Sequence, residues 1–397
     1  MKALLLENIH PDAEKVLATR GFEVETRSTA LAEDDLIEAL KGVDYLGIRS
    51  TTDLTARVIA ESPQLRAVGA FCIGTNQIDL DAAAQAGVAA FNAPYSNTRS
   101  VVELAVGEII ALARRLADKN RNMHDGLWEK SAISSHEIRG RTLGIVGYGN
   151  IGSQLSVLAE AMGMRVYFYD VADRLPLGNA RKVDSLDELL SKCETITLHV
   201  DGRASNMNMI GAREFALMPR RALFLNLSRG HLVDHNALAD ALKSGHIAGA
   251  AVDVFPKEPK KRDDQFVSPL QGIPNVILTP HVGGSTVEAQ IDIGRYVANK
   301  LADYEELGST SMSVNMPDIA AGPLSGPRIV HLHHNVPGVM AGLNSIFANS
   351  ELNILAQSLS TRGNIGYAVT DVQGEPERDM IEALRALDGT VNVRVLH

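Results

Sequence analysis

A glycine-rich stretch between two apolar runs, residues 142–170, constrains the fold of this chain more than any other feature. The first run leads into a G-x-G-x-x-G spacing, and the second run ends at Asp170. In this spacing the first glycine permits a tight turn, the second lets the backbone approach a pyrophosphate, and the third lets a helix pack close to the strand. The stretch therefore predicts a buried parallel strand, a turn, a helix and a second strand, with the three glycines at Gly147, Gly149 and Gly152.

Asp170 indicates which dinucleotide would bind. At the end of the second strand a carboxylate accepts hydrogen bonds from the adenosine ribose hydroxyls, and it would repel a ribose 2′-phosphate. The free N–H groups and the positive dipole end of the preceding helix suit the phosphates. Although Arg174 lies nearby in the sequence, we expect NAD rather than NADP.

Composition argues against several other classes of protein. A formal net charge of −10 opposes binding to nucleic acid or anionic membranes, so we expect local basic clusters such as Lys260–Arg262 to be solvated faces. Cys72 and Cys193 are too few for a disulfide framework or a cysteine-based zinc site. Residues 1–7 predict a strand rather than a signal peptide, and no apolar run reaches transmembrane length. We therefore expect a cytoplasmic protein.

The 397 residues suffice for two or three domains. Short apolar runs alternate with amphipathic helices, which predicts two doubly wound parallel-sheet domains, one formed by residues 1–96 and 284–322 and the other by residues 97–283. The expected strands of the first domain are 3–6, 43–48, 67–71 and 88–91, and those of the second, besides the two around the glycines, are 195–200, 222–227, 249–254 and 276–278.

The connection between these domains also has a recognisable pattern. Residues 98–117 carry apolar side chains at helical spacing and predict one helix that leads out of the first domain. The polar stretch 118–139, which contains Trp128, is either an arm that reaches a partner subunit or a surface loop anchored by this one aromatic side chain.

Beyond a stretch rich in Gly, Ser and Pro at residues 309–323, which is typical of a linker, residues 323–397 predict a third, ferredoxin-like domain. Its order is βαββαβ. No nucleophile and base come together there, so we expect ligand binding rather than catalysis. His331 and His333 would share one face of a strand, but no third ligand follows, and we expect no metal. The expected strands are 329–333, 353–360, 365–371 and 391–396, and the expected helices are 338–349 and 377–387.

Three polar side chains follow strands of the second domain, where ligands of parallel sheets gather. His281 can exchange a proton near neutral pH, and Glu258 could fix its tautomer and raise its pKa. Arg229 can bind a carboxylate and polarise a neighbouring carbonyl. Taken singly, each could be a strand cap or a loop residue. Their common edge, beside a nucleotide site, favours acid–base chemistry.

Similar reasoning applies to the first domain. Arg49 and Ser50 follow one expected strand, and a turn that contains Gly74 follows the next. The backbone N–H groups of this turn could hold a carboxylate. Arg49 is either an anion ligand or a surface arginine, and its position alone leaves both open.

Four segments together resemble the motif set of the D-2-hydroxyacid dehydrogenases, namely 147–152, 226–234, 249–259 and 278–284. Further segments resemble the members of this family that oxidise 3-phosphoglycerate in serine biosynthesis. These members carry a C-terminal ACT domain that binds serine as a feedback inhibitor. The resemblance covers essentially the whole chain, with the further segments at 71–81, 91–100, 167–170 and 175–179.

The resemblance implies roles for individual residues, and it implies that the first domain binds the substrate. The implied catalytic residues are His281 as acid and base, Glu258 as its partner and Arg229 as the substrate-orienting arginine. The implied NAD contacts are Gly147, Gly149, Asn150, Ile151, Gly152, Asp170, Leu227, Ser228, Asp253, Gly283 and Gly284. The implied substrate contacts are Arg49, Ser50, Ile73, Gly74, Asn97 and Lys130, and the implied serine contacts are His333, Asn335 and Asn353.

The resemblance further implies an NAD-dependent oxidation of 3-phospho-D-glycerate to 3-phosphohydroxypyruvate, inhibited by serine. It implies a homotetramer built through contacts of the NAD-binding and ACT domains. Two alternatives remain open at this stage. The same chemistry could act on an unphosphorylated acid such as hydroxypyruvate, glyoxylate or lactate, or the chain could be a non-catalytic protein that senses NAD(H).

Two positions depart from these relatives. They often carry a second arginine where this chain has Thr51, and the loss of one charge-assisted contact would weaken phosphate recognition by about 1.5 to 3 kcal/mol. They often have a glycine pair where this chain has Gly326 and Pro327. Because proline restricts its own φ and the residue before it, we expect a stiffer connection to the third domain.

Overall fold

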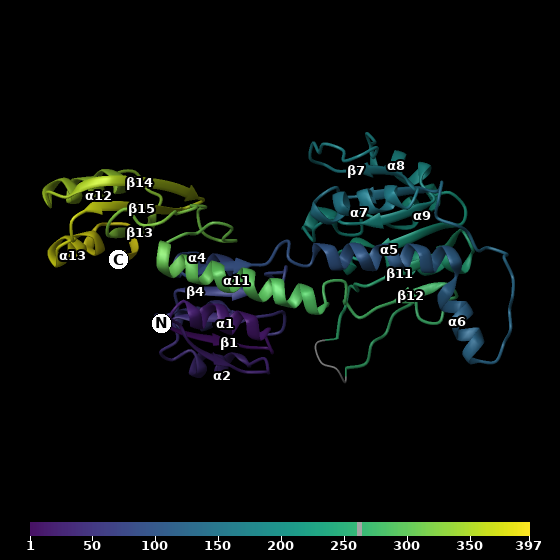
Figure 1. Cartoon of the computed structure of the whole chain (residues 1–397), viewed down its shortest axis with the longest axis horizontal. Coiled ribbons are helices and arrows are strands. Elements are labelled where there is room, and N and C mark those ends of the chain that lie inside the picture. The colour runs from purple at the N-terminus through teal and green to yellow at the C-terminus, as the bar shows by residue number, and fades with distance from the viewer. Residues whose placement is uncertain (260–263) are drawn as a thin grey trace. The chain divides into compact units, whose positions relative to one another are not determined.

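The computed structural model describes residues 1–259 and 264–397, so the basic cluster Lys260–Arg262 lies outside the described residues. The chain forms two compact units (Figure 1). The first comprises Met1–Ser96 and Gln290–His397, and the second comprises Asn97–Ala289. In the part of the chain that the structure describes, no helix is both long and apolar enough to cross a membrane.

The first unit contains a five-stranded parallel sheet in the order β2-β1-β3-β4-β5. Helices α1 and α11 pack on one face, while α2, α3 and α4 pack on the other, as the two apolar clusters on either side of the sheet show. The strands are β1 (Lys2–Leu5), β2 (Glu23–Thr26), β3 (Tyr45–Ile48), β4 (Ala67–Ala70) and β5 (Ala89–Asn92). The helices are α1 (Pro11–Thr19), α2 (Glu33–Ala39), α3 (Ala56–Ala60), α4 (Leu80–Ala86) and α11 (Val287–Leu307).

The sequence did not predict β2. Its residues Glu23–Thr26 are polar or only partly buried, because β2 is an edge strand, so the segment lacks the apolar run that marks the other strands. The expected strands at 3–6, 43–48, 67–71 and 88–91 are present with shifted ends.

Residues 309–322 do not form a free linker, which corrects the interpretation of their composition. Ser313 forms a bridge to Phe91 at the edge of the sheet, and the side chain of Asn315 accepts the Ala90 N–H at 2.8 Å and donates to Val88 O at 2.8 Å. Thr310 is fully buried. Small polar residues serve here to pair with an edge strand, a role that composition cannot distinguish from a flexible connection.

The second unit contains a seven-stranded parallel sheet in the order β12-β11-β10-β9-β6-β7-β8. Helices α5 and α7 pack on one face, whereas α8, α9 and α10 pack on the other. The strands are β6 (Thr142–Val146), β7 (Arg165–Tyr169), β8 (Arg181–Lys182), β9 (Thr195–Leu198), β10 (Ala222–Asn226), β11 (Ile247–Val252) and β12 (Val276–Leu278). The helices are α5 (Thr98–Arg114), α6 (Leu116–His124), α7 (Asn150–Ala161), α8 (Leu186–Lys192), α9 (Ala212–Leu217) and α10 (His235–Lys243).

The chain runs outward from β6 in both directions, so the direction of strand order reverses between β6 and β9. Such a reversal opens a crevice at the carboxyl ends of the strands, and ligands of doubly wound sheets bind there. The predicted fold class is confirmed for both parallel sheets.

The segment after α5 differs from the prediction of one helix over 98–117. The helix ends at Arg114, because Arg115 adopts a left-handed conformation with φ 54°, and α6 then begins at Leu116. Trp128 follows α6 and is 79% exposed, so it does not anchor this stretch to the unit. Of the two interpretations, the anchored surface loop is therefore wrong.

The last part of the first unit is the expected βαββαβ module, with an antiparallel sheet in the order β14-β15-β13-β16. Gly326 is not a free hinge, because a Cβ there would lie 2.4 Å from Val372 O, and Arg328, two residues later, is buried in an ion pair with Asp371. The strands are β13 (Arg328–His334), β14 (Asn353–Arg362), β15 (Ile365–Gln373) and β16 (Thr390–Leu396), with helices α12 (Val339–Asn349) and α13 (Arg378–Ala386). The division of the first unit into a substrate-binding domain and this module remains a prediction.

Candidate active site

The glycine turn after β6 has the geometry that the spacing requires. Gly147 has φ 92°, and a Cβ on it would lie 2.4 Å from His199 O. A Cβ on Gly152, in the first turn of α7, would lie 2.2 Å from Gly147 O. The space beside Gly149 is open, which leaves room for a ligand to approach the backbone. A pyrophosphate at the start of α7, next to Asn150 and Ile151, fits this turn.

Asp170 is held in place beside the turn. One carboxylate oxygen accepts the Tyr148 N–H at 2.8 Å, and the other accepts the Ala172 N–H at 2.8 Å. The Nε atom of Arg174 lies 3.9 Å from the carboxylate. Tyr148 also accepts the Leu177 N–H through its hydroxyl at 3.1 Å, so it ties the loop after β7 to the glycine turn. These residues fit the ribose of a dinucleotide that occupies the crevice.

Asp253, after β11, organises the loop that follows β12. It is 1% exposed, and its carboxylate accepts the Thr279 hydroxyl at 2.6 Å and the N–H groups of Val282 and Gly283, each at 2.8 Å. Its backbone oxygen accepts the His281 N–H at 2.8 Å. Asp253 therefore fixes the backbone of the loop that carries His281. Asp253 follows β11, which lies next to β10, the strand that Leu227 and Ser228 follow.

Glu108 on α5 is a buried acid that the sequence did not single out. It is 4% exposed, and neither carboxyl oxygen has a hydrogen-bond partner among the described residues. Burial, with the nearby charge of Asp253, raises the pKa of Glu108 to about 8. The raised pKa favours the protonated form of Glu108 at neutral pH, which avoids a second negative charge near Asp253.

His281 and Glu258 form the predicted pair. His281 Nδ1 lies 2.9 Å from Glu258 Oε2, and Glu258 Oε1 accepts the Phe255 N–H at 3.1 Å. The hydrogen bond to Glu258 raises the pKa of His281 above its ordinary value, although partial burial opposes this. Partial burial would raise the pKa of Glu258, but the hydrogen bonds from His281 and Phe255 lower it. The pair thus leaves His281 Nε2 as the atom that can exchange a proton.

Arg229 lies after β10, close enough for its charge to lower the pKa of Glu258 and to oppose protonation of His281. One of its nitrogens donates to Ser228 O at 2.7 Å, and it forms no ion pair with any described residue. Gly230 beside it explains how the two loops meet. A Cβ on Gly230 would lie 1.9 Å from the backbone carbon of Phe255, so only glycine fits there. No local sequence pattern indicates this role of Gly230.

The first unit gathers its own candidate residues at the carboxyl ends of β3 and β4. The Gln77 side-chain amide donates to Arg49 O at 2.5 Å, and the Asn92 amide donates to Ile73 O at 2.6 Å. These bonds join the loops that carry Arg49, Ser50, Ile73 and Gly74. The Arg49 guanidinium forms no ion pair within residues 1–259 and 264–397. The loop therefore offers one uncompensated positive charge.

The remaining two substrate candidates lie in the second unit. Asn97 precedes α5, and its Nδ2 atom would be 2.2 Å from a Cβ on Gly284, so the glycine allows this close approach. The Oδ1 atom of Asn97 is buried with no partner among the described residues, which leaves an acceptor for a ligand. Lys130 is exposed in the stretch after α6.

The three effector candidates do not come together within one chain. His333 is 2% exposed, and its Nδ1 atom lies 3.2 Å from Nδ1 of His331. Asn335 donates to Gly363 O at 3.3 Å, at one end of β15. Asn353 pairs with Gln373 at the other end of β15. A site that used Asn335 and Asn353 together would need a second copy of the module.

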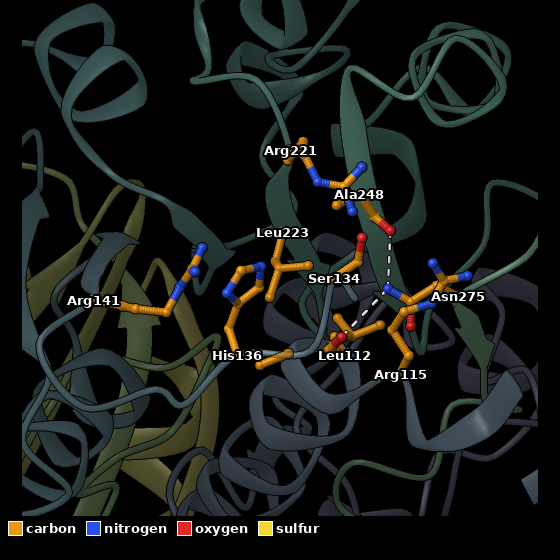
Figure 2. A pocket seen from close by; sticks show the side chains of 10 residues that line it. Leu112, Arg115, Ser134, His136, Arg141, Arg221, Leu223, Ala248 and Asn275 are labelled. Atoms are coloured by element: carbon orange, nitrogen blue, oxygen red, sulfur yellow. Dashed lines mark hydrogen bonds between the residues drawn. The ribbon is translucent and has the colours of Figure 1, made fainter. Parts of the chain in front are cut away.

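A separate pocket lies at the amino-terminal ends of β6, β10 and β11, and its lining includes Arg115, Arg141, Arg221 and Asn275 (Figure 2). The Asn275 side chain donates to Ala248 O and Leu112 O, as the dashed lines show. The volume of the pocket is about 20 Å³, enough for about one water molecule. Because ligands of doubly wound sheets bind at the opposite, carboxyl ends, this pocket is not the active site.

Comparison with known proteins agrees with this geometry. The NAD-binding domain family of D-isomer specific 2-hydroxyacid dehydrogenases matches residues 106–283, and a family described as an AHAS small subunit-like ACT domain matches residues 329–392. The D-3-phosphoglycerate dehydrogenase of Haemophilus influenzae is 49% identical, covering 100% of this chain and 97% of that protein. D-3-phosphoglycerate dehydrogenase 1 of Saccharomyces cerevisiae is 44% identical, covering 100% of this chain and 88% of that protein.

Solved structures give the same picture. The structure of D-2-hydroxyisocaproate dehydrogenase is 26% identical with a TM-score of 0.70, covering 79% of this chain and 100% of that one. D-lactate dehydrogenase with NAD+ from Lactobacillus jensenii is 28% identical with a TM-score of 0.66, covering 76% of this chain and 97% of that one. By its full-length identity to the curated relatives and its NAD-binding and ACT domains, the chain belongs to the D-3-phosphoglycerate dehydrogenase family, within the NAD-dependent D-2-hydroxyacid dehydrogenases.

Proposed function

We propose that the chain catalyses the NAD-dependent oxidation of 3-phospho-D-glycerate to 3-phosphohydroxypyruvate, the first step of L-serine biosynthesis, in the cytoplasm. The observation that carries this proposal is the 2.9 Å contact between His281 and Glu258 at the sheet edge that holds the cofactor turn. The full-length identity to relatives with this activity in their names supports the choice of substrate.

The residues present divide the reaction between them. NAD supplies the hydride acceptor when it is bound in the crevice beside Gly149 and Asp170. His281 Nε2 takes the proton of the C2 hydroxyl as the C2 hydride leaves, and the Glu258 carboxylate stabilises the resulting imidazolium. Arg229 binds the substrate carboxylate and the developing carbonyl oxygen, which holds C2 in place. In the reverse direction His281 returns the proton.

For the phosphate group of the substrate, we propose Arg49 and Ser50 as contacts, which follow β3. Thr51 favours the second candidate function, reduction of an unphosphorylated 2-oxo acid, because one guanidinium stands where relatives often have two. Steady-state rates with NADH and 3-phosphohydroxypyruvate, set beside hydroxypyruvate, test the proposal. We expect a strong preference for the phosphorylated substrate. Comparable kcat/KM values for the two substrates would contradict the assignment of the substrate but not that of the reaction type.

A second arginine should increase this preference. In Thr51→Arg, we expect the new charge-assisted contact to favour the phosphorylated substrate by about 1.5 to 3 kcal/mol. The measurement is the ratio of kcat/KM for 3-phosphohydroxypyruvate to that for hydroxypyruvate. Thr51→Gln is the matched control, since it adds length without charge and should leave the ratio unchanged. An equal gain on both substrates would contradict a phosphate contact at this loop.

Glu258 should control the pH dependence. Oxidation needs neutral His281, so its rate falls as pH decreases through the raised pKa of this histidine. In Glu258→Gln, the charge that stabilises the imidazolium is lost, and the pKa of His281 decreases. We expect the acidic limb of kcat/KM for oxidation to move to lower pH, while kcat falls by about ten-fold or more. If the acidic limb of the pH profile did not move, the limb would reflect the titration of a group other than His281.

Serine regulation and assembly form a further part of the proposal. The edge strand β14 is exposed along its length, including Ile354 at 41%, Leu355 at 48% and Leu359 at 47% exposure. Antiparallel pairing of two copies through β14 would bring the start of one strand beside the end of the other. Asn353 of one copy would then lie near Asn335 of the other, which completes a serine site. The second contact of a homotetramer would come from the stretch around Trp128 and Lys130.

A charged side chain on the β14 edge should disrupt assembly and serine inhibition without affecting turnover. In Leu359→Glu, we expect a smaller assembly by sedimentation and loss of serine inhibition, with turnover retained in the absence of serine. Met207→Glu places the same charge at another exposed apolar position, 60% exposed, and should change neither property. Full serine inhibition of a Leu359→Glu protein that no longer assembles through this edge would contradict a shared site.

A further inference from the structure

The loop that carries Arg49 is held by a carboxylate from a different strand end. Because β1 lies next to β3 in the sheet, the residues that follow these strands meet at the same edge. Glu7 follows β1. Its Oε1 atom accepts the N–H groups of Arg49 at 3.1 Å and Thr52 at 2.9 Å, and its Oε2 atom accepts that of Thr51 at 3.0 Å.

The backbone at Glu7 is strained in a way that serves this contact. Glu7 has φ 60° and Asn8 has φ 53°. Asparagine enters the left-handed region readily, but glutamate does so at a cost in free energy. Such a conformation persists when surrounding contacts determine it, and here three charge-assisted hydrogen bonds from the neighbouring loop do so. The strain therefore points to a requirement on the position of that loop.

The bonds leave a specific set of donors for a ligand. The N–H groups of Arg49, Thr51 and Thr52 are occupied by Glu7, and Gln77 occupies the carbonyl of Arg49. Among the described residues, the Ser50 N–H has no hydrogen-bond partner and the Arg49 guanidinium has no ion pair. Ser50 is also exposed. The loop thus offers the Ser50 N–H and the Arg49 guanidinium to a ligand, and the hydrogen bonds to Glu7 fix the backbone of both residues.

From this geometry we infer that Glu7 is a positioning residue for the anionic substrate, acting through Arg49 and the Ser50 N–H. The inference rests on the proposed function, since it assumes that Arg49 binds the substrate. Glu7 uses both carboxylate oxygens on the loop, so its negative charge is matched by three N–H dipoles rather than by the Arg49 guanidinium. This arrangement leaves the Arg49 guanidinium free to bind the anionic substrate. Because residue 51 is threonine, the loop has no second guanidinium that could take its place.

The first test is Glu7→Gln, which keeps the size of the side chain and its left-handed backbone. The amide group offers one acceptor oxygen instead of two and turns an NH2 group toward the loop. We expect KM for 3-phosphohydroxypyruvate to rise by about ten-fold, with kcat and the KM for NADH changed less than about two-fold. Glu25→Gln is the matched control, because Glu25 lies on the adjacent strand β2 and its carboxylate pairs, among the described residues, only with Lys2 and Arg27. It should change none of these parameters.

The second test separates positioning from a general effect on stability. In an Arg49→Gln background, the effect of Glu7→Gln on KM should shrink to the part that the Ser50 N–H carries, because the guanidinium that Glu7 positions is gone. An equal rise in KM in both backgrounds would overturn the inference. If Arg49→Gln raises KM but Glu7→Gln does not, the inference fails and the proposed function stands. If Arg49→Gln alone leaves KM unchanged, the assignment of Arg49 to the substrate fails, and the inference fails with it.

Discussion

Replacing His281 by asparagine is expected to lower kcat by about 10²- to 10⁴-fold, the range that general acid–base catalysis contributes. Asparagine suits the site, because His281 has φ 54° and asparagine is among the few residues that adopt this conformation readily. Its amide can still donate to Glu258, so the loop keeps its shape. What is lost is the ring nitrogen that takes the hydroxyl proton.

The measurement combines turnover with NADH binding. The loop after β12 is held by Asp253 rather than by the His281 ring, so the affinity for NADH, followed by its fluorescence, should remain within about two-fold. His136→Asn is the matched control, since His136 is exposed in the same unit and its ring forms no hydrogen bond with a described residue. If His281→Asn turned over at nearly the rate of the unmodified protein, the assignment of His281 as the acid and base would be contradicted.

Much of this site follows from local sequence patterns. The G-x-G-x-x-G turn and Asp170 can be predicted because their geometry is determined within one strand, turn, helix and strand. The proximity of Arg229, Glu258 and His281 can be predicted because parallel strands place their carboxyl ends on one edge. The contact between His281 and Glu258 was predicted in this way and is present at 2.9 Å.

Other features of the site depend on contacts between segments far apart in the sequence. Glu7 and the Arg49 loop are 42 residues apart, and no local periodicity connects a charged residue after one strand to a loop after another. Gly230 reads as an ordinary turn glycine until its packing against the Phe255 backbone is known. Asn315 belongs to a stretch whose composition resembles a linker, but its side chain pairs with β5. The order of strands in the sheet, which the sequence leaves open, decides all three.

Arg229 should contribute almost as much to the rate as His281. Its guanidinium forms no ion pair with a described residue, so its charge is available to the substrate. We expect Arg229→Gln to lower kcat/KM for 3-phosphohydroxypyruvate by about 10²- to 10³-fold, the range seen when a donor to a developing oxyanion is removed. Both kcat and KM should change, because the same fork binds the carboxylate and stabilises the transition state.

The two parts of this effect can be separated by a second substitution. Arg229→Lys keeps the positive charge but loses the planar fork, so we expect it to recover part of the affinity and little of the rate. Arg203→Gln is the matched control, because Arg203 is exposed near the same sheet edge and its charge is already paired with Asp201. Equal recovery of kcat and KM by lysine would mean that charge alone acts at this position. In that case the planar fork of Arg229 would not be what orients the substrate.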